Sequence, residues 1–145
     1  MDKINLEEMK LTDYPYKTYD KVRYCDTDRQ GHVNNAVFST FLETGRVEIL
    51  YNPDKPSASP VGSYVIAKNN LDLRAEIKWP GIVDIGTALT KIGNSSIHII
   101  QGVYQKEKLA ATAETVIVHV DTENGGSKPL NSATKEILKQ YLIEK

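Results

Sequence analysis

The sequence predicts an α+β domain in which one long helix lies across an antiparallel sheet. One observation behind this is a single long segment with helical periodicity, residues 35–51. The other is a series of strand-like segments joined by short turns, residues 71–120. An antiparallel sheet needs its apolar face covered, and the long helix is the element large enough to cover it. A sheet of this size leaves edges exposed, so we expect a dimer that extends the sheet or packs helix against helix.

Size and composition limit the possible functions. The 145 residues suffice for one domain, which we place over residues 1–145 with its core at about 18–122. With 18 basic and 19 acidic residues the net charge is −1, which argues against binding to nucleic acid. The single cysteine, Cys25, rules out an internal disulfide and a multi-cysteine metal site.

The sequence also bears on the compartment. It contains no apolar run near the ~20 residues that a membrane-spanning helix needs. The N-terminus lacks the uninterrupted apolar stretch of a signal peptide. We therefore expect a cytoplasmic protein without membrane insertion.

The first third of the chain is expected to supply a strand and a loop. Residues 1–15 are weakly patterned and predict at most a short turn around residues 6–11. Residues 18–24 (TYDKVRY) carry β-branched and aromatic side chains at strand spacing and predict the first strand. Residues 25–35 (CDTDRQGHVNN) predict a loop, because Asp, Gly and Asn favour turns and helix caps.

The long helix is expected to open at Asn34 or Asn35 and to run to about Tyr51, since an asparagine side chain accepts from free N–H groups of the first turn. Its apolar positions form one broad stripe: Val37, Phe38, Phe41, Leu42, Gly45 and Ile49. Gly45 lies on this stripe although glycine costs a helix about 1 kcal/mol relative to alanine. It indicates either close packing of the helix backbone or simple tolerance, and both readings stay open.

The remaining segments are expected to build the sheet. Residues 52–62 hold three of the six prolines and predict a long loop, after which YVIA is a candidate strand. Residues 71–78 (LDLRAEIK) alternate as a half-buried strand does, and WPG ends them. Three further strands are expected at residues 83–92, 96–105 and 109–120, with turns at 93–96 and 106–108. A closing helix, capped by Ser132, is expected over residues 132–143.

Residues 23–46, RYCDTDRQGHVNNAVFSTFLETGR, closely resemble the hot-dog-fold acyl-CoA thioesterases of the 4-hydroxybenzoyl-CoA thioesterase type. That family typically reads R-Y-x-D-T-D-x-x-G-H-V-N-N, followed by aromatics and by E-x-x-R on the central helix, where this chain has Glu43 and Arg46. GNSSIHIIQGVY resembles the family's G-x-S-S turn with a later tyrosine. The resemblance covers residues 18–120.

The resemblance implies a hot-dog fold, with a long central helix wrapped by a curved five-stranded antiparallel sheet, to which we add a small C-terminal helix. It implies hydrolysis of an acyl-CoA thioester, without a cofactor; a carrier-protein thioester is the alternative substrate. It also implies a homodimer or a dimer of dimers, with active sites between subunits.

The resemblance further implies the catalytic residues. Asp28 matches the family's carboxylate, which either attacks the thioester carbonyl or deprotonates a water; the alternative is an Asx turn before Gly31. The backbone N–H of Asn35, at the helix start, matches the oxyanion donor. Gly31 would let the substrate approach the loop closely. Glu43 is the reserve catalytic carboxylate, and its alternative is a surface pair with Arg46.

Substrate-binding residues are expected in two places. His32 and Asn34 lie in the catalytic loop. The alternative roles of His32 are a structural part of the loop or a catalytic acid or base, and the alternative role of Asn34 is a helix cap. The turn at 93–96 is where relatives often hold CoA phosphates, and here it supplies the neutral donors Asn94, Ser95 and Ser96. Lys91 is the nearest cation in sequence. The alternative for these residues is a plain hairpin turn.

Other functions fit less well. No metal site is expected, because the three histidines are scattered and no cysteine cluster exists. Asp26 is interpreted as a hydrogen-bonding residue of the loop. A hot-dog hydratase would show D-x-N-P-x-H, whereas this chain has DRQGH. Motifs of serine hydrolases and of dinucleotide-binding domains are missing. A non-catalytic acyl-CoA-binding module is the alternative that stays open.

Overall fold

One curved antiparallel sheet and two helices make up the fold. The computed structural model describes residues 4–54 and 62–143. The elements are a 3₁₀ turn at Leu11–Asp13, β1 Tyr16–Val22, a 3₁₀ turn at Tyr24–Asp26, α1 Asn35–Leu50, β2 Gly62–Leu73, β3 Gly81–Ile92, β4 Ser96–Gln105, β5 Lys108–Asp121 and α2 Ser132–Lys139. The strand order is β1-β3-β4-β5-β2, with every neighbouring pair antiparallel.

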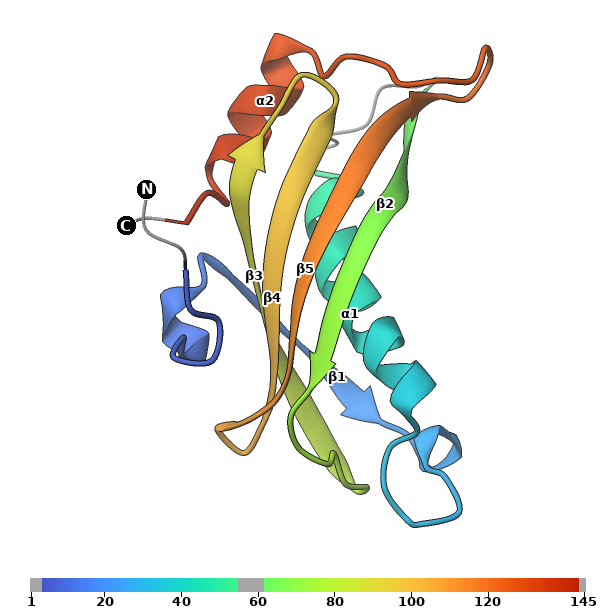
Figure 1. The fold of residues 1–145 in the computed structure, drawn as a ribbon, viewed down its shortest axis with the longest axis vertical. Helices are drawn as coiled ribbons and strands as arrows, with labels where there is room; N and C mark the ends of the chain where they lie inside the picture. Colours follow the sequence, from blue (N-terminus) through green and yellow to red (C-terminus); the bar gives the residue numbers. More distant parts are fainter. Residues whose placement is uncertain (1–3, 55–61, 144–145) are drawn as a thin grey trace.

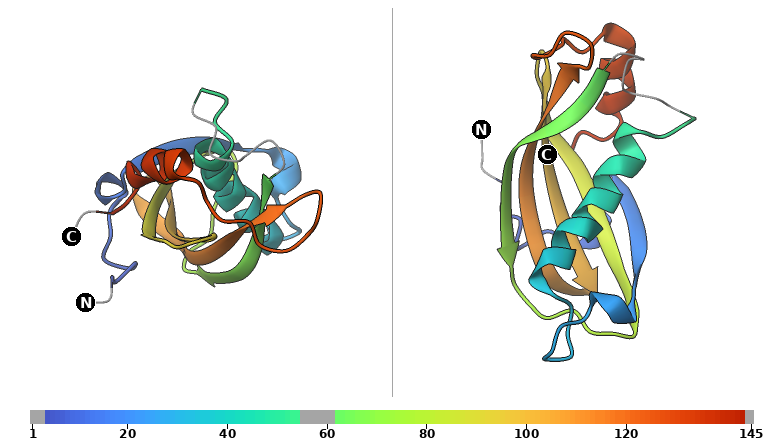
Figure 2. Two further views of the ribbon diagram at one scale, coloured as in Figure 1. Left: turned by 90° about the horizontal axis from the view of Figure 1, so that it is seen from above. Right: turned by 90° about the vertical axis from the view of Figure 1, so that its right-hand side faces the viewer.

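The sheet curves around α1, which runs along its concave side, and α2 covers one end (Figure 1, Figure 2). This confirms the predicted hot-dog architecture, a long helix wrapped by five antiparallel strands with a small C-terminal helix. β3, β4 and β5 carry the most buried side chains because they lie in the middle of the sheet.

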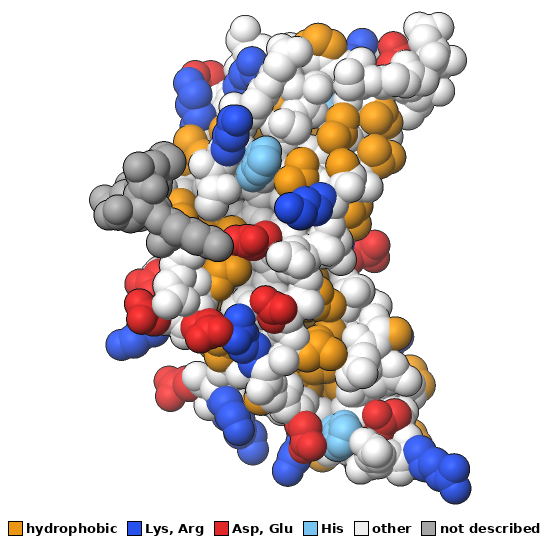
Figure 3. Space-filling view, in the orientation of Figure 1, with side chains coloured by type: hydrophobic (Ala, Val, Ile, Leu, Met, Phe, Trp, Pro, Cys, Tyr) orange, Lys and Arg blue, Asp and Glu red, His pale blue; other side chains and the backbone are white. Residues whose placement is uncertain are grey.

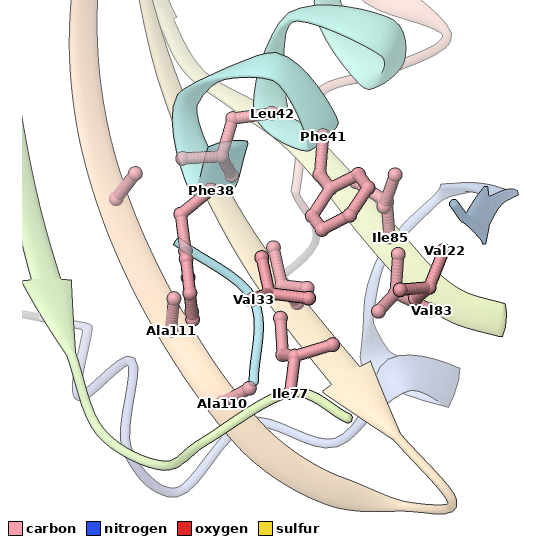
Figure 4. Close-up of a cluster of buried hydrophobic side chains, with 12 residues drawn as sticks. Val22, Val33, Phe38, Phe41, Leu42, Ile77, Val83, Ile85, Ala110 and Ala111 are labelled. Atoms are coloured by element: carbon pink, nitrogen blue, oxygen red, sulfur yellow. The ribbon is translucent and has the colours of Figure 1, made fainter. Parts of the chain in front are cut away.

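The core between α1 and the sheet has two halves. Around the first turns of α1 it comprises Val22, Val33, Phe38, Phe41, Leu42, Ile77, Val83, Ile85, Val103, Ala110, Ala111 and Ala113 (Figure 4). Around the last turns of α1 it comprises Ile49, Leu50, Leu89, Ile97, Ile99, Ile117, Leu130, Leu138 and Tyr141. These positions follow the helical and strand periodicities of the sequence, and their burial is the main stabilising contribution to the fold.

Gly45 lies where α1 comes closest to the sheet. A Cβ atom at this position would lie 2.7 Å from both Gln101 Nε2 and Thr87 Oγ1. Of the two readings of this glycine, close packing of the helix backbone is therefore confirmed.

We expect Gly45→Ala to lower the free energy of unfolding by up to about 2 kcal/mol. Overpacking costs about 1–3 kcal/mol, and the better helix propensity of alanine offsets about 1 kcal/mol of it. Urea denaturation measures the change. Ser39→Ala, at an exposed position of the same helix, is the matched control and should be neutral or slightly stabilising. A Gly45→Ala protein as stable as the Ser39→Ala protein would contradict the close packing.

The outer face of the sheet is covered by the N-terminal segment, which the sequence did not reveal. Tyr14 is 1% exposed, and its ring fills the space above Gly86 and Gly102. The Tyr104 hydroxyl donates to the Met9 carbonyl at 2.7 Å. The N-terminal residues therefore serve as a second apolar layer and not as a lead-in.

Several predicted boundaries are wrong. The first strand begins and ends two residues earlier than predicted, at Tyr16–Val22. The segment 71–78 is not a separate strand: residues 71–73 end the long strand β2, and the rest belongs to the connection that crosses the end of the sheet toward β3, in which Ile77 enters the core (Figure 1). The closing helix ends at Lys139 and is capped by Asn131, whose Oδ1 accepts from Thr134 N at 2.8 Å. Residues 55–61 of the proline-rich loop lie outside the described residues.

The strand β2 leaves one edge of the sheet unpaired within this chain. Residues 65–70 are exposed, and Val65, Ile66 and Leu73 are each about half exposed. Hydrophobic side chains gather over the upper part of this edge (Figure 3). Such an edge is typical of a surface that pairs with another strand.

In the described ranges of the chain, no helix is long and apolar enough to cross a membrane.

Candidate active site

The predicted catalytic loop forms a small hairpin at the N-terminal end of α1 (Figure 1). An isolated bridge pairs Thr27 with Val33, and Asp28 N donates to His32 O at 2.9 Å. Gly31 adopts a left-handed φ of +88°, a conformation that favours glycine, and its N–H donates to Asp28 O at 3.1 Å.

The Asp28 carboxylate has two different oxygen environments. Oδ1 accepts from Gln30 N at 2.9 Å, which is the Asx turn expected from the sequence. Oδ2 lies 3.8 Å from His32 Nδ1, beyond hydrogen-bond distance. The side chain is 29% exposed. One oxygen thus holds the loop, while the other accepts no hydrogen bond from the described residues.

Asp26 stabilises the start of the loop. It is 2% exposed and accepts from Arg23 N and Arg23 Nη2, both at 2.8 Å. These bonds raise the pKa of the exposed Arg23 guanidinium. The carbonyl of Asp26 also accepts from Asn34 N at 2.9 Å. The interpretation of Asp26 as a hydrogen-bonding residue of the loop is confirmed.

The start of α1 offers one free donor. Asn34 is the cap, since its Oδ1 accepts from Ala36 N at 3.0 Å. Val37 N donates to Asn34 O. Among the described residues, the backbone N–H of Asn35 has no hydrogen-bond acceptor. It is the first N–H of a 16-residue helix and lies at the positive end of the helix dipole.

The loop is anchored to the core between these two groups. Val33 N donates to Ile77 O at 2.8 Å, and both side chains point into the cluster beneath Phe38 and Phe41 (Figure 4). Asp28 and the Asn35 N–H therefore sit on either side of a fixed, buried residue. Carboxylate chemistry and oxyanion stabilisation both need such fixed geometry.

His32 lies between two carboxylates. Its Nδ1 is 3.8 Å from Asp28 Oδ2, and its Nε2 is 3.5 Å from Glu76 Oε1. Glu76 could not be predicted as a neighbour of the loop. The alternation of residues 71–78 places it on the polar face of a strand, and nothing in the local sequence links it to His32. His32 is thus placed beside Asp28 and Glu76.

Glu43 and Arg46 diverge on α1. Glu43 is exposed and lies eight residues beyond Asn35, roughly 12 Å along the helix axis. Arg46 is 5% exposed, and its Nη1 donates to Gln101 Oε1 at 3.3 Å. Burial lowers the pKa of Arg46. The expected surface pair is therefore wrong, because Arg46 turns into the core.

The second group of predicted binding residues lies at the far end of the sheet (Figure 1). β3 begins at Gly81, which pairs with Val22 beside the catalytic loop, and ends at Ile92 before the turn. That is roughly 35 Å of strand. One chain alone does not bring this group together with Asp28. Its members are Lys91, Asn94, Ser95 and Ser96.

The backbone of this turn has structural partners. Asn94 O accepts from Leu130 N, and Ser95 O accepts from His119 N, each at 2.8 Å. His119 is 2% exposed with Nδ1 2.9 Å from Lys128 O, a partnered core histidine as interpreted. Across residues 4–54 and 62–143, no three His, Cys, Asp or Glu side chains gather into a group that could hold a metal ion.

Comparisons with known proteins agree with this fold. A predicted thioesterase from Bacillus stearothermophilus is 25% identical, with a TM-score of 0.79 over 90% of this chain and 98% of that chain. A thioesterase from Thermus thermophilus, complexed with coenzyme A and Zn, is 27% identical, with a TM-score of 0.72 over 88% and 93% of the two chains.

A protein from Pseudomonas aeruginosa is 18% identical and supports the fold alone, with a TM-score of 0.83 over 93% of this chain and 96% of that chain. No curated protein sequence matches the chain. The family model of the thioesterase-like superfamily matches residues 22–138. Since that match runs from the end of β1 into α2, the chain belongs to the thioesterase-like superfamily.

Proposed function

We propose that this chain hydrolyses acyl-CoA thioesters through Asp28 and the backbone N–H of Asn35. The observation that carries the proposal is the pairing, within one anchored loop, of a partly exposed carboxylate and a free helix N-terminal donor. The family match assigns the class of reaction. The resemblance of the loop to 4-hydroxybenzoyl-CoA thioesterases supports the choice of residues.

Two routes use these groups. In one, Asp28 Oδ2 attacks the thioester carbonyl carbon, the C–S bond breaks to release the thiolate, and water hydrolyses the resulting anhydride. In the other, Asp28 takes a proton from a water whose oxygen attacks the same carbon, and the thiolate again leaves. In both, negative charge develops on the carbonyl oxygen, where the Asn35 N–H donates to it. Gly31 leaves the approach over the loop free of a side chain. Glu43 stays the reserve carboxylate.

Coenzyme A is the proposed thiol half because the Thermus thermophilus relative binds it. A carrier-protein thioester is the alternative substrate. We also propose a homodimer, or a dimer of such dimers, that pairs the free β2 edges. Exposed Val65 and Ile66 on that edge support this assembly. In it, Asn94, Ser95 and Ser96 of one subunit would reach a site whose Asp28 belongs to the other, with His32 and Asn34 beside that Asp28.

Release of free thiol from a panel of short, long and aromatic acyl-CoAs, together with carrier-protein thioesters, tests the proposal. We expect turnover of at least one acyl-CoA class. If only carrier-protein thioesters are turned over, the thiol half of the substrate is a carrier protein and not coenzyme A. Acyl-CoA binding without turnover of any thioester would identify a non-catalytic binding module and contradict the proposal.

A further inference from the structure

A small cleft beside the catalytic loop gathers positive charge. It lies between residues 76–80 and the β4–β5 turn and has a volume of about 330 Å³. The residues that line it are Glu76, Lys78, Pro80, Gln105, Lys106 and Lys108. We call this the lysine cleft. The sequence did not reveal it, because its two sides are about 30 residues apart and each lysine alone reads as an ordinary exposed charge.

The two sides of the lysine cleft are joined by one glutamine. Gln105 Oε1 accepts from Lys78 N at 2.9 Å, and Gln105 Nε2 donates to Lys78 O at 2.8 Å. This pair of bonds fixes the segment that carries Lys78 against the turn that carries Lys106. Lys78 also forms an isolated bridge with His32. The two sides of the cleft are therefore held in fixed positions, and the cleft lies at the same end of the sheet as Asp28.

The charge balance favours an anion. Three lysines and one carboxylate, Glu76, line the cleft, and that carboxylate lies 3.5 Å from His32 Nε2. Glu107 in the same turn lines a different cavity, together with Asp84 and Tyr104. By comparison, the residues of the β3–β4 turn at the far end of the sheet are neutral, and the cations beside it are Lys91 and Lys128, whose segment is hydrogen-bonded to the turn.

The turn itself carries a cost. Lys106 and Glu107 have φ values of 50° and 69°, in the left-handed region where two-residue hairpin turns strongly prefer Asn-Gly. Lysine at such a position is strained, and strain of this kind clusters at functional sites.

We propose that the lysine cleft binds the phosphate groups of the coenzyme A nucleotide. The choice of ligand rests on the proposed function, since the substrate must carry its phosphates at a distance from the thioester set by the flexible pantetheine arm. Lysines bind phosphate as point charges and need no fixed fork geometry. The cleft thus supplies three lysines, whereas residues 93–96 of the β3–β4 turn are themselves neutral.

Calorimetric binding of coenzyme A tests the proposal without turnover. We expect Lys106→Asn combined with Lys108→Ala to raise the Kd for coenzyme A roughly tenfold or more. Asparagine suits the left-handed turn, so this variant should fold at least as stably as the native chain. Lys139→Ala removes one exposed charge on α2 and serves as the control with unchanged affinity. Inorganic phosphate and dephospho-CoA, titrated in parallel, show which part of the nucleotide is bound.

Turnover gives the second readout. For an acyl-CoA substrate the double variant should raise KM and leave kcat close to the native value, while kcat/KM for the matching acyl-pantetheine should not change. Unchanged coenzyme A affinity, equal loss with acyl-pantetheine, or inorganic phosphate bound as tightly as coenzyme A would overturn the proposal. Loss of affinity in Lys91→Ala instead would assign the phosphates to the β3–β4 turn. Because binding is measured directly, a chain that binds coenzyme A through the cleft but hydrolyses nothing refutes the proposed function alone.

Discussion

Replacing Asp28 by Asn should lower kcat by roughly 10²–10⁴-fold, the contribution typical of a positioned acid–base group. The asparagine oxygen can still accept from Gln30 N, so the Asx turn and the shape of the loop survive. What disappears is the negative charge on the oxygen that faces His32. KM should change little, because no binding group for the nucleotide is touched. Steady-state thiol release, with unfolding curves for both proteins, measures the effect.

Two further variants sharpen this result. Asp28→Ala removes both the charge and the turn, so it should lose stability as well as activity. Glu43→Gln should keep near-native turnover, since Glu43 is exposed and distant from the loop. A folded Asp28→Asn protein with native kcat would remove Asp28 from the mechanism. Inactivity of Glu43→Gln in the same assay would identify the helix carboxylate as the catalytic one.

Replacing Gln101 by Leu should destabilise the fold by about 3 kcal/mol or more. Gln101 is fully buried, and its Nε2 donates to Leu42 O at 2.9 Å and to Thr87 Oγ1 at 3.1 Å. Its Oε1 accepts from the buried Arg46 guanidinium. Leucine has a similar size but leaves the Thr87 hydroxyl and the Arg46 guanidinium without this partner, and each buried unpaired group costs about 1–3 kcal/mol. Leu42 O keeps its helical hydrogen bond within α1. Urea denaturation measures the loss.

A double-mutant cycle with Arg46→Met isolates the charged contact. Methionine removes the buried cation, so the double variant should lose less stability than the two single variants added together. The expected coupling lies within the roughly 0.5–3 kcal/mol seen for residues that share a hydrogen-bond network. Strictly additive losses would show that Arg46 and Gln101 act independently, and that the 3.3 Å contact contributes nothing.

Elements defined by local periodicity could be predicted from the sequence. The apolar stripe of α1 and the alternation in β3, β4 and β5 are set by which side chains face the core, and both are visible in the chain. The segment 71–78 was wrongly predicted as one strand, because its apolar positions are buried in two different ways. Residues 71–73 pair with β5, whereas Ile77 is buried because the connection from β2 to β3 passes beneath the first turns of α1 (Figure 4). Pattern alone does not separate a strand from such a loop.

Long-range contacts could not be predicted in the same way. Tyr14 is buried because glycines of β3 and β4 leave room for its ring, and those strands lie more than 70 residues further along the chain. The i,i+3 spacing of Glu43 and Arg46 predicted a surface ion pair. Helical spacing carries no information about Gln101, the distant residue that accepts a hydrogen bond from Arg46. In the candidate site, the loop motif indicated Asp28 and Asn35. The positions of Glu76 and of the lysine cleft are set by the path of residues 74–80 between β2 and β3 (Figure 1). Nothing in the local sequence signals that path.

The bond pair between Gln105 and Lys78 has a consequence for mixtures of defective variants, assayed at a substrate concentration below the native KM. It keeps the lysine cleft and the Asp28 loop on the same polypeptide. An Asp28-deficient chain and a cleft-deficient chain, co-assembled as a hybrid oligomer, would then carry one defect in every site and show no intersubunit complementation. If the β3–β4 turn of the partner recognises the phosphates instead, an Asp28-deficient chain mixed with a turn-deficient chain would form one fully intact site per hybrid dimer. Genetic complementation thus distinguishes a self-contained catalytic unit from a shared one.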